Sequence, residues 1–229
     1  MQFRTLAIGT LLAIATQSFA VSQASTYRAD SPLNLVDYVI SQQKRQASQS
    51  QSTRFKVRIE NISTTDEFIA SNGTPWTLDF SPGVWLVSNS QAPLFMVGQK
   101  DWGQGIESIA EDGDPANLAM ALQSQKSQQS SGIFNTAVNA TKVGGIRPGQ
   151  AFEFTVTASP GQKLSFVTMF GQSNDWFYAP QTGISLFDAA GKPISGDVTS
   201  QVGLWDDGTE VDEEPGIGPN QGPRQPVPN

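Results

Sequence analysis

The feature that most constrains the fold is a pair of alternating segments separated by a short turn. Apolar side chains occupy every second position in residues 152–157, and the same alternation returns in residues 164–170. Between them, Ser159-Pro160-Gly161 has the composition of a turn. Because a period of two is typical of a strand with one buried face, this region is predicted to form a β-hairpin.

Short apolar runs of the same kind recur through the rest of the chain. Phe55, Val57 and Ile59 alternate with charged residues and predict the strand that opens the domain. Further strands are predicted at residues 80–87, 94–97, 183–187 and 202–205. Many short strands separated by turns predict an all-β chain, folded as an antiparallel β-sandwich.

One short helix is expected in a loop inserted between these strands. Asp114-Pro115 has the composition of a helix start, and apolar residues then recur at helical spacing as far as Leu122. An acidic cluster of Glu111, Asp112 and Asp114 stands just before it. We expect this cluster to favour the N-terminus of the helix through the helix dipole.

Three flanking segments are predicted to lie outside the domain, which is expected at residues 53–214. Residues 1–20 read as a signal peptide, because Arg4 precedes an apolar run that ends near small residues. That run is about half of the ~20 residues that a transmembrane helix requires, which disfavours a membrane anchor. Residues 21–52 are a Gln/Ser-rich linker and residues 215–229 a Pro/Gly-rich tail. The mature chain is therefore expected to be secreted, either periplasmic or extracellular.

The chain contains no His and no Cys, which excludes several kinds of chemistry. A Ser-His-Asp triad, a Cys nucleophile, a conventional zinc site and disulfides cannot form. The carboxylate, hydroxyl and amide oxygens that remain suit a hard cation such as calcium. A net charge of -7 without a basic cluster argues against nucleic acid as a partner. An exported chain without disulfides is more typical of bacteria than of animals.

Two acidic loops follow predicted strands. The first, residues 171–176, contains Asp175; the second, residues 206–214, contains six carboxylates. If the preceding strands run in the same direction, both loops lie at one end of the sandwich and can supply the ~6–8 oxygens that calcium needs. The alternative is a solvated acidic stretch on the surface, and the spacing matches no EF-hand.

The order of several motifs resembles the spondin domain, which is found in F-spondin, mindin and bacterial secreted relatives. The most specific pieces are the Ser-x-Asp-Trp loop at residues 173–176 and the Trp-Asp-x-Gly-Thr turn at residues 205–209. Segments 55–61 and 80–85 are also similar to the family, so the resemblance covers residues 53–224. It implies a synaptotagmin-like β-sandwich that binds one calcium ion, in a non-catalytic module for recognition or adhesion.

The resemblance also implies which residues hold the ion. The metal carboxylates of the family fall on Asp175, Asp206 and Glu210, and Glu210 stands where animal members usually have Asp. Because the Glu side chain is one methylene longer than that of Asp, its carboxylate reaches further from the backbone when it binds the ion. Asp207 and Asp212 are either further ligands or contributors to the local field. The expected partner is an extracellular protein or glycan.

Two other functions are compatible with the residues. A carboxylate-pair glycoside hydrolase needs only two carboxyl groups, and the five Trp residues could line its subsites. We nevertheless expect no enzymatic activity, because the acidic run is crowded, loop-borne and polar, and the Trp residues are more simply core or loop anchors. The other alternative is a structural matrix component whose calcium is incidental.

Overall fold

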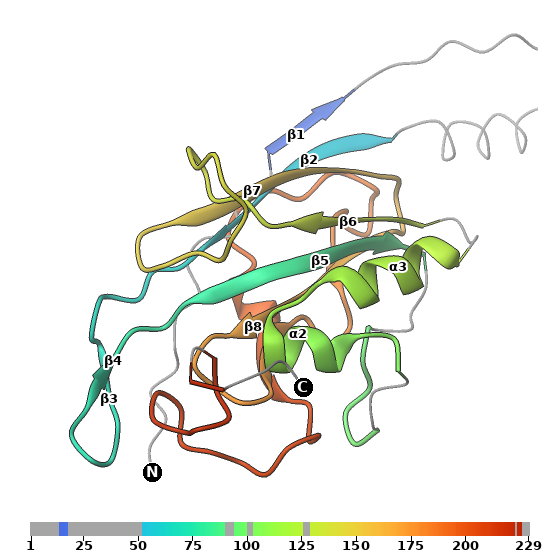
Figure 1. Ribbon diagram of the computed structural model, residues 1–229. Helices are drawn as coiled ribbons and strands as arrows, with labels where there is room; N and C mark the ends of the chain where they lie inside the picture. Colours follow the sequence, from blue (N-terminus) through green and yellow to red (C-terminus); the bar gives the residue numbers. More distant parts are fainter. Residues whose placement is uncertain are drawn as a thin grey trace, which may run out of the picture.

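The computed structural model of the chain describes residues 14–17, 52–89, 94–99, 103–125, 129–222 and 224–225 (Figure 1). Apart from 14–17, the predicted signal peptide lies outside these residues. So does the predicted linker, apart from Ser52. Within the described part, no helix is long and apolar enough to cross a membrane.

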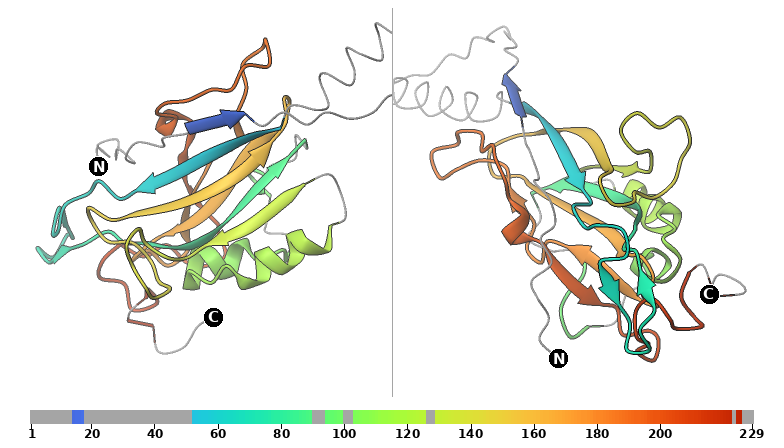
Figure 2. Two further views of the ribbon diagram at one scale, coloured as in Figure 1. Left: turned by 90° about the horizontal axis from the view of Figure 1, so that it is seen from above. Right: turned by 90° about the vertical axis from the view of Figure 1, so that its left-hand side faces the viewer.

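Two antiparallel sheets form the body of the molecule, which confirms the prediction of a mostly β sandwich (Figures 1 and 2). The first sheet has the strand order β1 (Ile14–Gln17), β2 (Thr53–Glu60), β7 (Ala151–Ala158). The second has the order β11 (Gly203–Asp206), β9 (Trp176–Ala179), β8 (Lys163–Phe170), β5 (Phe80–Ser88), β6 (Ser130–Phe134). The short strand β10 (Ile184–Ser185) also pairs with β8, and β3 (Phe68–Ile69) and β4 (Pro75–Trp76) form a separate small hairpin.

The predicted hairpin is wrong, although both of its strands form where expected. β7 pairs with β2 in the first sheet, whereas β8 pairs with β5 and β9 in the second. The turn at Ser159-Pro160-Gly161 therefore connects the two sheets. The alternating residues identify the side of each strand that faces the core between the sheets, and these two sides meet across the sandwich. β8 is also buried on its other side, under the helices. The strand expected at residues 94–97 is also wrong, since residues 94–99 form bends and turns.

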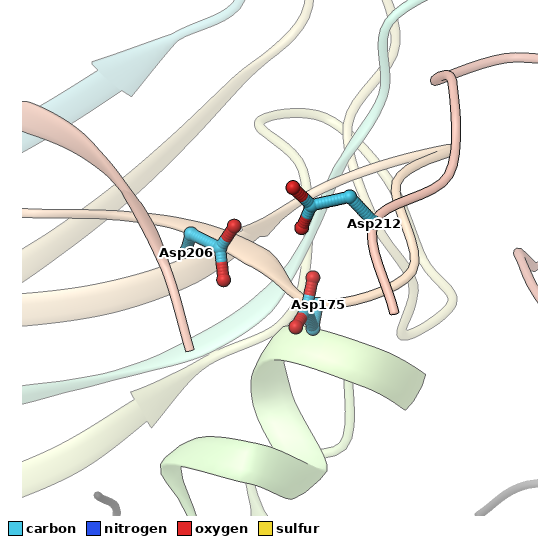
Figure 3. A group of neighbouring side chains, drawn as sticks. All are labelled: Asp175, Asp206 and Asp212. Carbon is cyan, nitrogen blue, oxygen red and sulfur yellow. The ribbon is translucent and has the colours of Figure 1, made fainter. Parts of the chain in front are cut away.

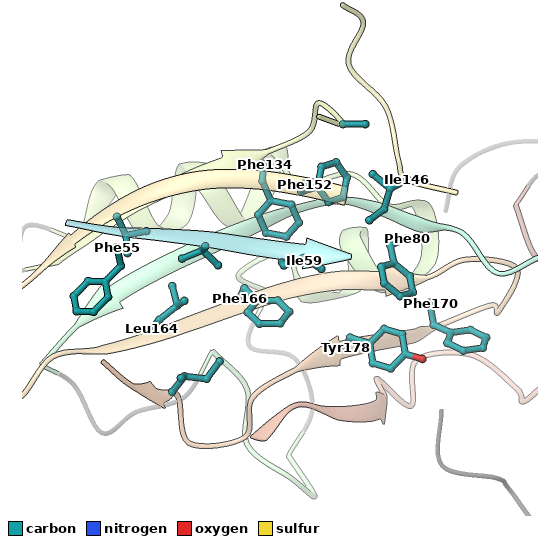
Figure 4. Close-up of a cluster of buried hydrophobic side chains, with 14 of the residues drawn as sticks. Phe55, Ile59, Phe80, Phe134, Ile146, Phe152, Leu164, Phe166, Phe170 and Tyr178 are labelled. Carbon is teal, nitrogen blue, oxygen red and sulfur yellow. The ribbon is translucent and has the colours of Figure 1, made fainter. Parts of the chain in front are cut away.

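The core fills the space between the sheets with large aromatic and aliphatic side chains (Figure 4). Phe55, Val57 and Ile59 are each at most 1% exposed, as their alternation predicts. The ring of Phe134 lies 5.1 Å from that of Phe152, a contact that connects the two sheets. The other labelled core residues in the figure are Phe80, Ile146, Leu164, Phe166, Phe170 and Tyr178.

Helices α2 (Ile106–Asp112) and α3 (Ala116–Ser124) pack on the opposite face of the second sheet (Figure 2). The sequence predicted only α3. α2 has seven residues and begins after Gly105. Because glycine has no side chain that could cap the helix, α2 lacks the usual sequence signal of a helix start. The expected role of the acidic cluster is corrected accordingly, because Glu111 and Asp112 end α2. Asp114 alone of the three lies between the helices, and it accepts the Ala116 N–H at 2.9 Å.

The described part of the C-terminal segment contains turns and packs against the domain. Gln221 is fully buried, and its side-chain oxygen accepts hydrogen bonds from the N–H groups of Gly216 and Gly218. A side chain at Gly216 would overlap the ring of Trp76, so the segment lies directly on the core. It therefore helps to cover the same end of the molecule as the acidic loops.

Candidate metal centre

Strand pairing brings the two acidic loops to one end of the second sheet. β8 and β11 both pair antiparallel with β9, so they run in the same direction, as the sequence argument required. Asp206, the last residue of β11, pairs with Trp176, the first residue of β9. This register places Asp206 beside Asp175, which immediately precedes β9.

Three carboxylates meet at this position. One carboxylate oxygen from each of Asp175, Asp206 and Asp212 lies within 4.8 Å of the others (Figure 3). Asp175 is buried, and Asp206 and Asp212 are exposed. The group thus has a closed side formed by the protein and an open side facing solvent, and it could hold a metal ion.

Asp175 has one satisfied and one unsatisfied oxygen. Its Oδ2 accepts the Glu210 N–H at 3.3 Å. Within the described residues, Oδ1 is buried and has no hydrogen-bond partner. Burial raises the pKa of Asp175, and the charges of Asp206 and Asp212 raise it further. A buried carboxylate with a free oxygen and two acidic neighbours is the environment that a cation stabilises.

Asp206 is held by its own loop. The Gly208 N–H donates to Asp206 Oδ1 at 2.7 Å, in a turn that requires the positive φ of 71° at Gly208. The negative charge of Asp206 raises the pKa of Asp212. The two side chains are therefore close enough to repel each other in the absence of a cation.

Asn174 holds the segment that carries Asp212. Its side-chain nitrogen donates to the Val211 carbonyl at 3.1 Å, and its oxygen accepts the Glu213 N–H at 3.3 Å. These bonds flank Asp212 on both sides, and Asn174 is fully buried. Sequence reasoning missed this residue. It occupies the variable position of the Ser-x-Asp-Trp motif, and only its position next to Asp175 could have suggested a role.

Only some of the predicted ligands belong to the group of three carboxylates. Asp175 and Asp206 come together as predicted, and Asp212, predicted as a further candidate, supplies the third carboxylate. Glu210 lies outside this group and contributes its backbone N–H to Asp175. Asp207 donates its backbone N–H to the Asp175 carbonyl at 3.1 Å. Ligation by the Glu210 side chain stays a prediction.

A groove of about 1040 Å³ lies next to the site. Asp79 and Glu111 both line it, as does Arg147. Burial raises the pKa of Asp79, while Arg147, whose Nε is 3.8 Å from Asp79 Oδ2, lowers it. Burial also raises the pKa of Glu111.

The described Trp residues anchor different parts of the fold. Trp76 and Trp176 both pack against Phe170, with ring centroids 5.8 Å apart in each case. Trp205 packs against Phe95 and donates its indole N–H to the Ala179 carbonyl at 2.9 Å. These contacts support core and loop-anchoring roles. Trp102 lies outside the described residues.

Comparison with known proteins adds no assignment to this geometry. No protein-family model matches the chain, and no curated protein matches it.

Proposed function

We propose that this chain is a secreted, calcium-binding recognition or adhesion module of the spondin type, without catalytic activity. One observation carries the proposal: Asp175 Oδ1 is buried without a hydrogen-bond partner, inside a group of three carboxylates. In the absence of a cation this arrangement costs stability, because buried charge and like-charge repulsion both oppose ionisation. A bound cation removes both penalties.

The chemistry of the group favours calcium over other metals. All three side chains are carboxylates, and the chain has no His or Cys to attract zinc or copper. Calcium accepts irregular sets of oxygen ligands, including carbonyls and water, more readily than magnesium does. Because Asp206 and Asp212 are exposed, water or an oxygen atom of an extracellular protein or glycan can complete the shell.

Calorimetric titration of the full chain with calcium tests this proposal. We expect one ion per chain and a dissociation constant that Asp212→Asn raises at least about 10-fold, because a charged ligand is lost. Glu210→Gln is the matched control, since it removes a carboxylate that lies outside the group of three and should change the constant by less than about 3-fold. A larger effect of Glu210→Gln than of Asp212→Asn would favour the ligand set implied by the resemblance. Absence of calcium binding by the parent refutes the proposal.

A second candidate, a polysaccharide hydrolase, is favoured by one observation. Asp79 and Glu111 line the same groove, and burial raises the pKa of both, as general acid catalysis requires. Glu111 is nevertheless only 4% exposed and accepts a hydrogen bond from Thr209, which makes it a poor acid. Assay of the parent and of Asp79→Asn on a panel of glycans decides the matter, since turnover lost in the variant would establish the hydrolase.

A further inference from the structure

One hydrogen bond ties the acidic loop to helix α2. The Thr209 hydroxyl donates to Glu111 Oε1 at 2.6 Å, between residues 98 positions apart in the sequence. Glu111 lies in the last turn of α2, and Ile106 and Ile109 of the same helix are at most 1% exposed against the second sheet. The turn that carries Thr209 is thus attached to the core through α2.

Glu111 is an unfavourable choice for this position on stability grounds alone. Burial raises the pKa of its carboxyl, and the neighbouring charges of Glu107, Glu210 and Asp112 raise it further, against the lowering effect of the Thr209 hydrogen bond. A negative charge in the last turn also opposes the helix dipole. Residues that oppose local stability are most often found where a site needs them.

We propose that Glu111 and Thr209 are positioning residues for the metal site, an inference that rests on the proposed calcium-binding function. The backbone N–H of Glu210, the residue after Thr209, donates to Asp175 Oδ2 at 3.3 Å. Fixing the Thr209 side chain on α2 holds the adjacent Glu210 N–H against Asp175 Oδ2 and leaves Oδ1 for the ion. Neither Glu111 nor Thr209 needs to contact the ion, because both act through Asp175.

Calcium titration of the full chain and four single variants tests this inference. Thr209→Val keeps the shape of the side chain and removes the hydroxyl, so we expect the dissociation constant to rise about 10-fold, as is usual when support behind a metal ligand is lost. Thr209→Ser restores the hydroxyl and should remain within about 2-fold of the parent. Glu111→Ala should match Thr209→Val, whereas Glu111→Gln retains an acceptor and should stay near the parent. A double variant, Glu111→Ala with Thr209→Val, should bind no more weakly than either single variant.

The unfolding midpoint in excess chelator separates positioning from general support of the fold. A lower midpoint in Thr209→Val with an unchanged dissociation constant overturns the inference. Equal weakening by Glu111→Ala and Glu111→Gln, with none from Thr209→Val, also overturns it, because the charge of Glu111 would then matter and its hydrogen bond would not. If the parent itself binds no calcium, the proposed function fails and the inference with it. Binding by the parent that all four single variants retain removes the inference alone.

Discussion

Tyr178 places its hydroxyl inside the core between the sheets. The residue is 3% exposed, its ring lies 5.3 Å from that of Phe80, and the hydroxyl has no hydrogen-bond partner within the described residues. Burial accordingly raises the pKa of Tyr178. An unpaired hydroxyl in such a site lowers stability, so we expect Tyr178→Phe to stabilise the chain by about 1 kcal/mol in urea unfolding. A loss of stability would show that the hydroxyl has a partner, such as a buried water.

Asp79 gives a second prediction at the scale of the residue, concerning pH. Burial raises its pKa and Arg147 partly opposes this, so the folded chain holds its proton more tightly than the unfolded chain. Its contribution to stability is therefore full below the unfolded pKa of ~3.9 and is lost as pH rises through the folded value.

Asp79→Asn imitates the protonated form at every pH. In chelator we expect this variant to be more stable than the parent at pH 7, and the difference to vanish near pH 4. The gain should remain below about 1 kcal/mol, because the side chain is 41% exposed and solvent screens its charge. Urea unfolding at several pH values measures the difference, and a gap that widens as pH falls would contradict the assigned direction.

The sequence predicts part of the set of metal ligands. Asp175 and Asp206 could be predicted because each borders a strand, and strand pairing alone brings them together. Whether Glu210 or Asp212 is the third ligand could not be predicted from the sequence, because it depends on the path of the loop after Gly208. Asn174 and the Glu111–Thr209 hydrogen bond set that path, and both connect residues distant in the sequence.

At the scale of elements, helix α2 should be an integral part of the core. Ile109 is fully buried among residues of α3 and the second sheet. We expect Ile109→Ala to destabilise the chain by about 2–5 kcal/mol, the usual cost of a large cavity. Met120→Ala is the control, since Met120 is 61% exposed on α3 and its loss should change stability by less than about 0.5 kcal/mol. Equal, small effects would mean that the helical layer is loosely attached.

The strands were predicted from the sequence more accurately than their pairing. The alternation in β7 and β8 identified both strands and their buried faces, yet the short turn between them suggested a hairpin. Partner choice depends on β2 and β5, which lie far away in the sequence and pair more extensively with these strands. Helix α2 was missed because seven residues without a side-chain cap carry little signal.

At the scale of the whole molecule, the site lies at the end of a sheet that is covered on both faces. The first sheet packs on one face and the two helices on the other, so the core fixes β9, and β11 is held by its pairing with β9. We therefore expect the chain to fold without calcium. Far-ultraviolet circular dichroism in excess chelator should show an intact β spectrum at 25 °C, and a disordered spectrum would mean that the metal is needed for folding itself.

The most direct test of the central claim is the thermal unfolding midpoint of the full chain in excess chelator and again in millimolar calcium, with magnesium as the control. A ligand at 100 times its dissociation constant adds about 2.7 kcal/mol, which is roughly 5–11 °C for a domain of this size. Our account predicts a calcium-selective rise of that order, abolished by Asp206→Asn. An unchanged midpoint in calcium would contradict it and leave the three carboxylates as a solvated acidic surface.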